Sequence, residues 1–212
     1  MVNSGLGRCI VHCSNSALVF VRPQARLSAG GTREHRIAMR ITLNPNPDFK
    51  PPRGVHICIL GKADIPLLEE HLTGLDAKGR HDRFNGVLDT EGIADYARRC
   101  IHPGVMVIAA EKDGHVIGVA ELHPATTEIA EAAFSVDAKW RGHGIGAALF
   151  ALVIEAAWSR GLAQLEISTH ADNDAMKHLA RKFGAGLTFD HGDGTGRIDL
   201  EKIQFTETGA AG

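Results

Sequence analysis

The chain has few aromatic residues and few cysteines. Phe, Trp and Tyr together make up 5% of its 212 residues, and Tyr96 is the single tyrosine. The four cysteines are scattered, which indicates neither a disulfide framework nor a zinc site. They are Cys9, Cys13, Cys58 and Cys100. We therefore expect a reducing compartment, and a cytoplasmic location, for this protein.

An excess of charge of one sign and long apolar runs are lacking as well. With 23 basic and 25 acidic residues the formal charge is −2, so the sequence makes no electrostatic case for nucleic acid or an anionic membrane as a partner. No apolar run approaches the roughly 20 residues that cross a bilayer. The hydrophobic fraction of 44% suffices for one sizeable core. These features predict a soluble domain of enzyme size.

A metal-binding motif is also missing, although the chain has twelve histidines. None belongs to a His-Glu-x-x-His sequence, and no two lie four residues apart on a predicted helix. We predict scattered surface histidines and no metal. Even His143, which lies between two glycines, is expected to point into solvent.

The first forty residues differ in composition from the rest of the chain. They contain six arginines and a single acid, Glu34, and no apolar periodicity persists in them. Disorder is the expected state. Such a segment also suits an organellar transit peptide, and residues 9–21 weakly resemble a secretory core. We favour a third interpretation, in which Met39 is the biological start.

Four prolines within residues 44–53 predict an extended linker into a folded domain. We therefore divide the chain into three parts. They are a leader with its linker over residues 1–53, one domain over residues 54–206, and a flexible tail over residues 207–212.

From Val55 onward, the apolar periodicity predicts alternating strands and helices. Expected strands cover residues 55–60, 105–110, 115–122, 130–136, 163–169, 187–189 and 198–203. Expected helices begin at Asp64, Thr90, Gly144, and Asp172 or Asn173. Because Asp113-Gly114 favours a tight hairpin, the three strands that follow residue 104 should be antiparallel. We expect a polar connecting segment over residues 76–84 and a hairpin turn over residues 191–196.

The most informative run is Val136-Asp137-Ala138-Lys139-Trp140-Arg141-Gly142-His143-Gly144-Ile145-Gly146, between a predicted strand and a predicted helix. Its three alternate glycines let the backbone approach a ligand closely and adopt positive φ. Their amides, together with the N-terminus of the helix, suit a pyrophosphate. Arg141 adds a charged donor beside them.

The spacing of this run narrows the choice of nucleotide-binding turns. Gly142, Gly144 and Ala147 satisfy the dinucleotide fingerprint, but Glu166, at about the distance of its acidic residue, lies inside a strand rather than at the end of one. A phosphate-binding loop of the NTPase kind needs Gly-Lys-Ser/Thr, which is absent from the sequence. What remains, Arg-x-x-Gly-x-Gly/Ala after an antiparallel strand, resembles the acyl-CoA-binding turn of the GNAT N-acyltransferase superfamily.

The resemblance extends from Val55 to Phe189. Residues 130–137 resemble the fourth strand of that fold, and residues 172–185 resemble its later Asn-to-Gly-Phe segment, with Ala185 where Phe is usual. Residues 67–72 and 79–84 are similar to a bacterial branch related to protein-lysine acetyltransferases. The implied fold is of the α/β (α+β) class. It has a central mixed, mostly antiparallel sheet, helices on both faces, and strands splayed at the cofactor gap.

The resemblance implies an acyl-CoA-dependent N-acyltransferase in which a neutral amine attacks the thioester of acetyl-CoA within a ternary complex. Backbone groups of Phe134, Ser135 and Val136 would bind the pantetheine, and Asn173 would steady it from the opposite side. The pyrophosphate would lie on Arg141, Gly142, His143, Gly144, Ile145 and Gly146. The acceptor is a protein lysine or a small amine, and the protein is a monomer or a homodimer. A CoA-binding sensor without catalysis is the alternative.

An ammonium group must lose a proton before it attacks, so the mechanism needs a base or a water chain. We predict Glu131 as this base, since it resembles the carboxylate position of the lysine-acetylating branch. An exposed strand residue paired with a neighbouring Arg or Lys is an equally open interpretation. Glu166 and, less favoured, Glu128 are held in reserve.

The expected general acid is missing. Many superfamily members carry a Tyr seven residues after the Asn of the later helix, and that position is Ala180. We interpret Tyr96 as a packed helix residue far from this position. A thiolate whose thiol has a pKa of about 8.5 can leave without a dedicated acid, so no residue is assigned this role. The acceptor mouth is expected between residues 76 and 89 and at the hairpin near His191.

Overall fold

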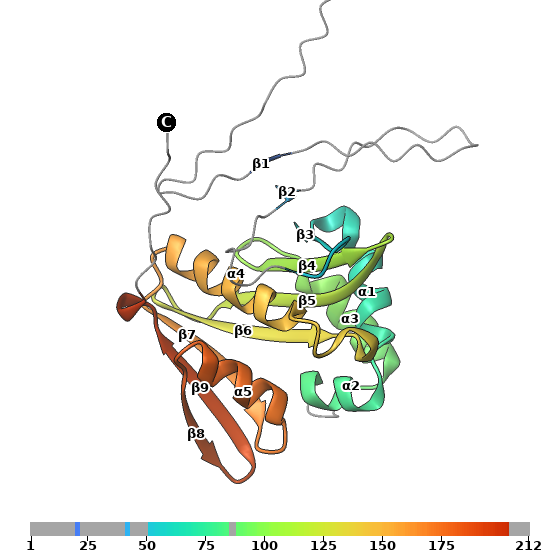
Figure 1. Ribbon diagram of the computed structural model, residues 1–212. Helices are drawn as coiled ribbons and strands as arrows, with labels where there is room; N and C mark the ends of the chain where they lie inside the picture. Colours follow the sequence, from blue (N-terminus) through green and yellow to red (C-terminus); the bar gives the residue numbers. More distant parts are fainter. Residues whose placement is uncertain (1–19, 22–40, 43–50, 85–87, 204–212) are drawn as a thin grey trace, which may run out of the picture.

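The structure is a computed structural model that describes residues 20–21, 41–42, 51–84 and 88–203 (Figure 1). Most of the predicted leader and the whole predicted tail, residues 207–212, therefore lie outside the described residues. Within the leader, two short strands are described, β1 (Phe20–Val21) and β2 (Ile41–Thr42). The predicted start at Met39 and the division of the chain at residue 53 stay predictions.

All described strands belong to one nine-stranded sheet with the order β1-β2-β3-β4-β5-β6-β7-β9-β8. Its longer strands are β3 (His56–Ile59), β4 (Met106–Lys112), β5 (His115–Pro124), β6 (Ile129–Val136), β7 (Gln164–His170), β8 (Gly186–Asp190) and β9 (Asp193–Asp199). Among the described strands, β6 and β7 are the one parallel pair. The predicted mixed, mostly antiparallel sheet is confirmed.

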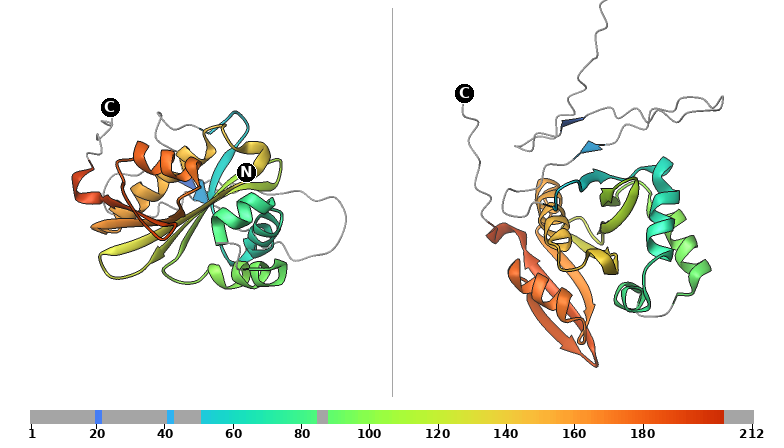
Figure 2. Two further views of the ribbon diagram at one scale, coloured as in Figure 1. Left: turned by 90° about the horizontal axis from the view of Figure 1, so that it is seen from below. Right: turned by 45° about the vertical axis from the view of Figure 1, so that its right-hand side comes forward.

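Helices cover both faces of the sheet, as predicted (Figures 1 and 2). They are α1 (Ile65–Thr73), α2 (Ala77–Phe84), α3 (Thr90–Cys100), α4 (Ile145–Ser159) and α5 (Asp174–Lys182). On one face α4 packs on β4, β5 and β6, while α5 packs on β7 and β8. On the other face α1 packs on β5, and α2 packs on β6 and β7. None of the helices in the described part of the chain is both long and apolar enough to span a bilayer.

Strand alternation sends side chains of β6 to two different cores. Ala130 and Ala132 are buried against α4 in the larger apolar cluster, where the ring of Phe134 stacks on Phe150 with their centroids 4.8 Å apart. Glu131 and Ser135 point to the face covered by α1 and α2. The sequence therefore assigned the two faces of this strand correctly.

The hairpin predicted from Asp113-Gly114 is confirmed. Asp113 has a φ of 50° and Gly114 a φ of 86°, the left-handed conformations of a tight primed turn. This turn sets the antiparallel register of β4 and β5, which begins with Lys112 opposite His115.

The polar segment expected over residues 76–84 is wrong, because residues 77–84 form α2. Asp76 accepts a hydrogen bond from the Gly79 amide at 2.8 Å and so satisfies one free donor at the helix start. The helix has no apolar stripe. It reaches the sheet through polar side chains, Arg83 to Glu121 on β5 and His81 stacked on His170 of β7. Hydrophobic periodicity has nothing to detect in such a helix.

Two further boundaries differ from the predictions. Asp89, and not Thr90, caps α3, accepting from the Gly92 amide at 2.8 Å. Strand β9 begins at Asp193, inside the region predicted as a turn. There Gly194 lies beneath the Phe189 ring, where a Cβ atom would clash, so this glycine serves close packing rather than a turn.

Candidate acyl-CoA and acceptor site

The parallel strands β6 and β7 separate at the centre of the sheet. Their register runs from Ile129 opposite Gln164 to Ala132 opposite Ile167 and then ends. Beyond this point β6 stays paired with β5 as far as Val136, and β7 stays paired with β9. The inner edge of β6 over residues 133–136 therefore carries peptide groups that β7 does not use. This is the predicted splay.

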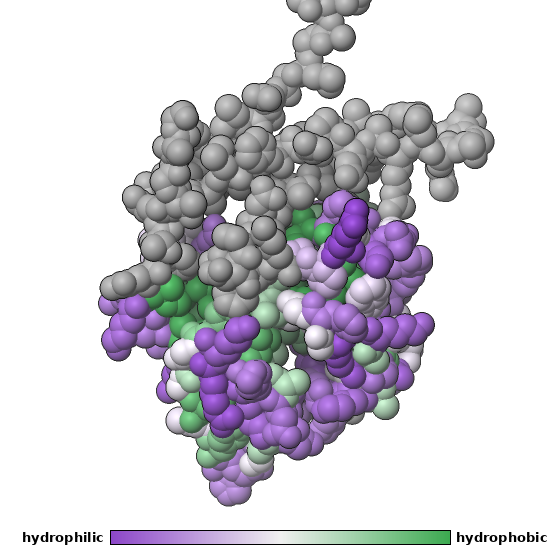
Figure 3. All heavy atoms as spheres, in the orientation of Figure 1, coloured by the Kyte–Doolittle hydropathy of each residue, from purple (hydrophilic) through white to green (hydrophobic). Residues whose placement is uncertain are grey.

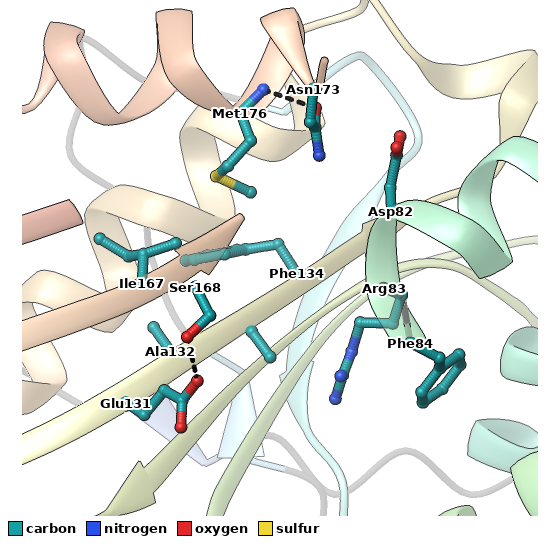
Figure 4. A pocket seen from close by; sticks show the side chains of 11 residues that line it. Asp82, Arg83, Phe84, Glu131, Ala132, Phe134, Ile167, Ser168, Asn173 and Met176 are labelled. Carbon is teal, nitrogen blue, oxygen red and sulfur yellow. Dashed lines mark hydrogen bonds between the residues drawn. The ribbon is translucent and has the colours of Figure 1, made fainter. Parts of the chain in front are cut away.

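A cavity of about 350 Å³ opens where the strands separate (Figure 4). Its lining comes from β6, β7, the start of α5 and the end of α2. The lining residues are Asp82, Arg83, Phe84, Glu131, Ala132, Ala133, Phe134, Ile167, Ser168, Asn173 and Met176. Figure 3 shows a hollow between the α5 side and the α2 side of the molecule, with hydrophilic residues on both rims. The opening can admit a polar ligand from solvent.

The glycine-rich turn lies between β6 and α4. Gly142 and Gly144 have φ values of 76° and 84°, and both are exposed. Gly144 is the N-cap of α4, so the first free amides of this helix follow it directly. Gly146 lies in the helix with an ordinary φ. Two of the three glycines thus have the predicted positive φ, and the third is a helical residue without a side chain.

The Arg141 side chain is bound to two residues outside the glycine-rich turn, Asp76 and Val136. Its guanidinium forms a two-pronged ion pair with Asp76, 3.0 Å on one prong and 2.5 Å on the other, and its Nε donates to the Val136 carbonyl at 3.2 Å. The hydrogen bond from Arg141 lowers the pKa of the Asp76 carboxyl. The side chain thereby ties the turn to the start of α2.

The other predicted residues of the turn differ in exposure. His143 is exposed, as predicted, and its Nδ1 lies 2.9 Å from the Arg141 carbonyl. Ile145 is only 1% exposed and packs its side chain into the core. The backbone of Ile145, rather than its side chain, is what this position offers a ligand.

Ser135 is buried and turned toward α1. Its hydroxyl lies 2.9 Å from Nε2 of His71, a fully buried histidine whose Nδ1 is 3.1 Å from the Val116 carbonyl and 3.3 Å from Asp137. This contact fixes the end of β6 against α1. The odd-numbered residues of β6 are the ones whose peptide groups bond to β5, as those of Ile129 and Asp137 do, so the peptide groups of Ser135 point toward Val119 and those of Phe134 and Val136 face the gap. The backbone contact predicted for Ser135 is therefore less well placed than those of its two neighbours.

Asn173 lies across the cavity from β6. It is the N-cap of α5, and its Oδ1 accepts from the Met176 amide at 3.0 Å. Its amide nitrogen points into the cavity (Figure 4). The capping geometry therefore leaves a donor facing the gap, opposite Phe134.

Glu131 lines the cavity and is exposed. Its carboxylate accepts a hydrogen bond from the Ser168 hydroxyl at 2.8 Å (Figure 4). The partner is thus a neutral hydroxyl, and not the Arg or Lys of the alternative interpretation. A carboxylate held in this way keeps a free oxygen with which to accept a proton.

The two reserve carboxylates are less well placed. Glu166 lies directly opposite Glu131 in the register of β6 and β7, but Gln164 donates to it at 2.8 Å and Arg197 at 2.9 Å. Glu128 is exposed before the start of β6 and does not line the cavity. Of the three, Glu131 alone combines access to the cavity with an unpaired charge.

A buried polar cluster beside Glu131 was not foreseen from the sequence. Its centre is Glu121 on β5, whose side chain is 1% exposed. Arg83 donates to Oε2 at 2.8 Å, His123 lies at 2.8 Å, Cys100 at 3.3 Å, and the Tyr96 hydroxyl donates to the same oxygen. The residues come from α2, α3 and β5, so spacing along the chain could not bring them together.

Burial alone would raise the pKa of Glu121. The charge of Arg83 and the hydrogen bonds from His123 and Tyr96 outweigh burial and hold this pKa at about 2, so the carboxylate is ionised at neutral pH. Burial raises the pKa of the Cys100 thiol to about 12 and also raises that of Tyr96. Both groups therefore remain protonated donors toward Glu121.

Cys100, Glu121 and His123 are close enough together to approach one metal ion, and they are the one such group among the described residues. The guanidinium of Arg83 already neutralises the carboxylate that would bind it. A divalent cation beside this group would meet like-charge repulsion. The chemistry of the cluster therefore favours a hydrogen-bond network.

The position of the missing tyrosine is closed off. Ala180 is 0% exposed and packs in the apolar core, away from the cavity. Tyr96, interpreted as a packed helix residue, lies instead in the network around Glu121, where Arg83 donates to its hydroxyl at 2.6 Å. Neither position supplies an acid to the cavity.

A family model described as the acetyltransferase (GNAT) family matches residues 78–185, just over half of the chain. The chain belongs to the GNAT acetyltransferase family. The predicted family, fold and N-acetyltransferase activity are thereby confirmed. No curated protein sequence was found to match.

Solved GNAT structures share the fold at low sequence identity. The GNAT domain of S. lividans PAT is 19% identical with a TM-score of 0.60, over 68% of this chain and 90% of that one. The yncA protein of Salmonella typhimurium, a putative acetyltransferase solved with acetyl-CoA, is 19% identical with a TM-score of 0.56, over 73% and 98%. Ribosomal-protein-alanine N-acetyltransferase from Brucella melitensis is 24% identical with a TM-score of 0.55, over 68% and 98%.

Proposed function

We propose that this GNAT protein binds acetyl-CoA across the gap between β6 and β7 and transfers the acetyl group to a primary amine, either a protein lysine or a small amine. The observation that carries the proposal is the end of the β6–β7 register at Ala132, in the strand that leads to the glycine-rich turn. An extended ligand can continue the sheet there, and a helix N-terminus follows for its charged end.

The diphosphate would lie on the amides of residues 142–146. Gly142, His143 and Gly144 are exposed, and the positive end of the α4 dipole adds to their amides. Arg141 would hold the turn in place through its ion pair with Asp76. The pantetheine would bond the peptide groups that β6 turns toward the gap, those of Phe134 and the amide of Val136, with Asn173 on the opposite side.

Glu131 would act as the base. The N–H bond of the acceptor ammonium breaks, its proton passes to the Glu131 carboxylate, and the electron pair stays on nitrogen. The amine then attacks the thioester carbonyl, and the peptide donors of β6 stabilise the developing oxyanion. The C–S bond breaks with its electron pair on sulfur and the carbonyl re-forms. The extra proton on the attacking nitrogen passes through solvent to the thiolate, which leaves a neutral amide and the free thiol of CoA.

Calorimetry with CoA and acetyl-CoA, together with free-thiol release across a panel of amines, tests this proposal. We expect binding of both ligands and turnover with at least one amine. Absence of any heat of binding would contradict the proposal. Binding without turnover for every amine would favour the CoA-binding sensor, which the absence of a tyrosine at position 180 makes the second candidate.

The variant Glu131→Gln tests the role of Glu131 as base separately from the binding of acetyl-CoA. We expect kcat to fall about 100-fold or more at neutral pH with recovery at high pH, where the amine loses its proton unaided. The affinity for acetyl-CoA should stay unchanged. Glu128→Gln is the matched control, since this carboxylate does not line the cavity. Equal rates for the wild type and Glu131→Gln at every pH would exclude the base role.

The cytoplasmic location and the oligomeric state stay predictions.

A further inference from the structure

The strands of the sheet align a row of ionisable side chains across the acceptor face. His123 lies directly opposite Glu131, Glu131 opposite Glu166, and Glu166 opposite Arg197. Directly opposed residues on neighbouring strands have Cβ atoms about 4.5–5.5 Å apart. His123 is therefore the neighbour of the proposed base on the β5 side.

The orientation of the His123 ring follows from its contact with Glu121. The ionised carboxylate can only accept, so Nε2, 2.8 Å away, carries the hydrogen. In a neutral ring Nδ1 then keeps its lone pair. Among the described residues, the hydrogen-bond network around Glu121 engages Nε2 of His123 and not this nitrogen, and the side chain is 30% exposed.

We propose that His123 is a positioning residue for proton transfer, which receives through Glu131 the proton that the acceptor ammonium loses. This inference rests on the proposed function. The proton passes from the Glu131 carboxylate to Nδ1 of His123, directly or through one water. Glu131 regains its negative charge, and the imidazolium forms beside Glu121 and then releases a proton to solvent.

The surroundings of His123 favour this transfer. The charged and titratable groups that face it from the neighbouring elements are Glu121 on β5, Arg83 on α2, Tyr96 and Cys100 on α3, and Glu131 on β6. Arg83 and Glu121 offset each other, and Tyr96 and Cys100 stay neutral. The charge that faces the imidazolium is therefore that of Glu131 after it has given up its proton, as one carboxylate faces the histidine of a catalytic triad.

Nitrogen NMR of the ¹⁵N-histidine-labelled full chain without ligand tests the arrangement independently of turnover. At pH 8 we expect His123 with Nε2 protonated and Nδ1 unprotonated. Glu131→Gln should shift the Nδ1 resonance, whereas His115→Gln, on the far end of β5, should not. The opposite tautomer, or an Nδ1 resonance that Glu131→Gln leaves in place, would overturn the inference.

Turnover with acetyl-CoA and the best amine of the panel tests the role. We expect His123→Gln to lower kcat about tenfold or more with KM for acetyl-CoA unchanged, and added imidazole to restore part of the rate in His123→Gly. The exposed His115→Gln should keep the wild-type kcat. An unchanged kcat in His123→Gln, with CoA binding intact, would overturn this inference alone. Failure to bind CoA would overturn the proposed function, and the NMR arm would still decide the geometry.

Discussion

Different interactions stabilise the two faces of the sheet. On the α4 face, apolar side chains such as Leu149 and Phe150 pack with 0% exposure, and the energy comes from the hydrophobic effect. On the α1–α3 face, an apolar cluster surrounds buried polar groups, among them Glu121, Arg83 and His71. The first face needs only the right volume and shape. The second also needs each buried polar partner in place, and it is the face that Glu131 shares.

The largest effect expected from this difference is the loss of Glu121. Glu121→Leu leaves the guanidinium of Arg83 buried without its counter-charge, so we expect the free energy of unfolding to fall by about 3–5 kcal/mol. Urea denaturation of the wild type and of Glu121→Leu measures this difference in the free energy of unfolding. The double variant Glu121→Leu/Arg83→Met should recover most of this loss. A fall below about 1 kcal/mol in the single variant would mean that the pair is solvated like a surface one.

Acid should destabilise the polar face through the same carboxylate. The folded-state pKa of Glu121 is about 2, against an ordinary value of 4.5. Its contribution is therefore complete above pH 4.5 and is lost as the pH falls from 4.5 toward 2. Urea midpoints measured across this window should fall more steeply for the wild type than for Glu121→Gln. Parallel curves for the two proteins would contradict the assignment.

The apolar face should reject the tyrosine that many relatives of the superfamily carry. Because Ala180 has no exposed surface, Ala180→Tyr overpacks the core, and we expect a loss of about 1–3 kcal/mol in urea denaturation. Ala180→Ser, which adds little volume, is the size control. A stable Ala180→Tyr variant with a raised kcat would show that the position reaches the cavity after all.

The smallest effect concerns the turn that joins the two faces. Gly142→Ala forces a side chain into a positive φ, which costs about 1–2 kcal/mol. Gly146→Ala is the matched control, because its Cβ would meet its nearest neighbour at an ordinary 3.6 Å and alanine favours a helix. Thermal melting measures the stability of the two variants, and calorimetry measures their affinity for CoA. Equal losses of stability in both variants would contradict the distinction between the two glycines.

Much of the fold could be predicted because its signals are local. The Asp113-Gly114 turn, the alternation in β6 and the apolar helix α4 each show their period or turn chemistry within a few residues. Helix α2 escaped prediction because its inner face uses Arg83, a residue that periodicity counts as exposed. Only the counter-charge of Glu121, distant in the sequence, explains why an arginine is buried there.

The sequence by itself determined the glycine-rich turn, the order of strands and helices, and the face on which Glu131 lies, because these follow from backbone sterics and the period of a strand. Only the tertiary structure decided that Arg141 pairs with Asp76, that Ala180 is closed off from the cavity, and that His123 is the neighbour of Glu131. Such contacts join residues that are far apart along the chain, and sheet register and helix packing, rather than any local preference, bring them together.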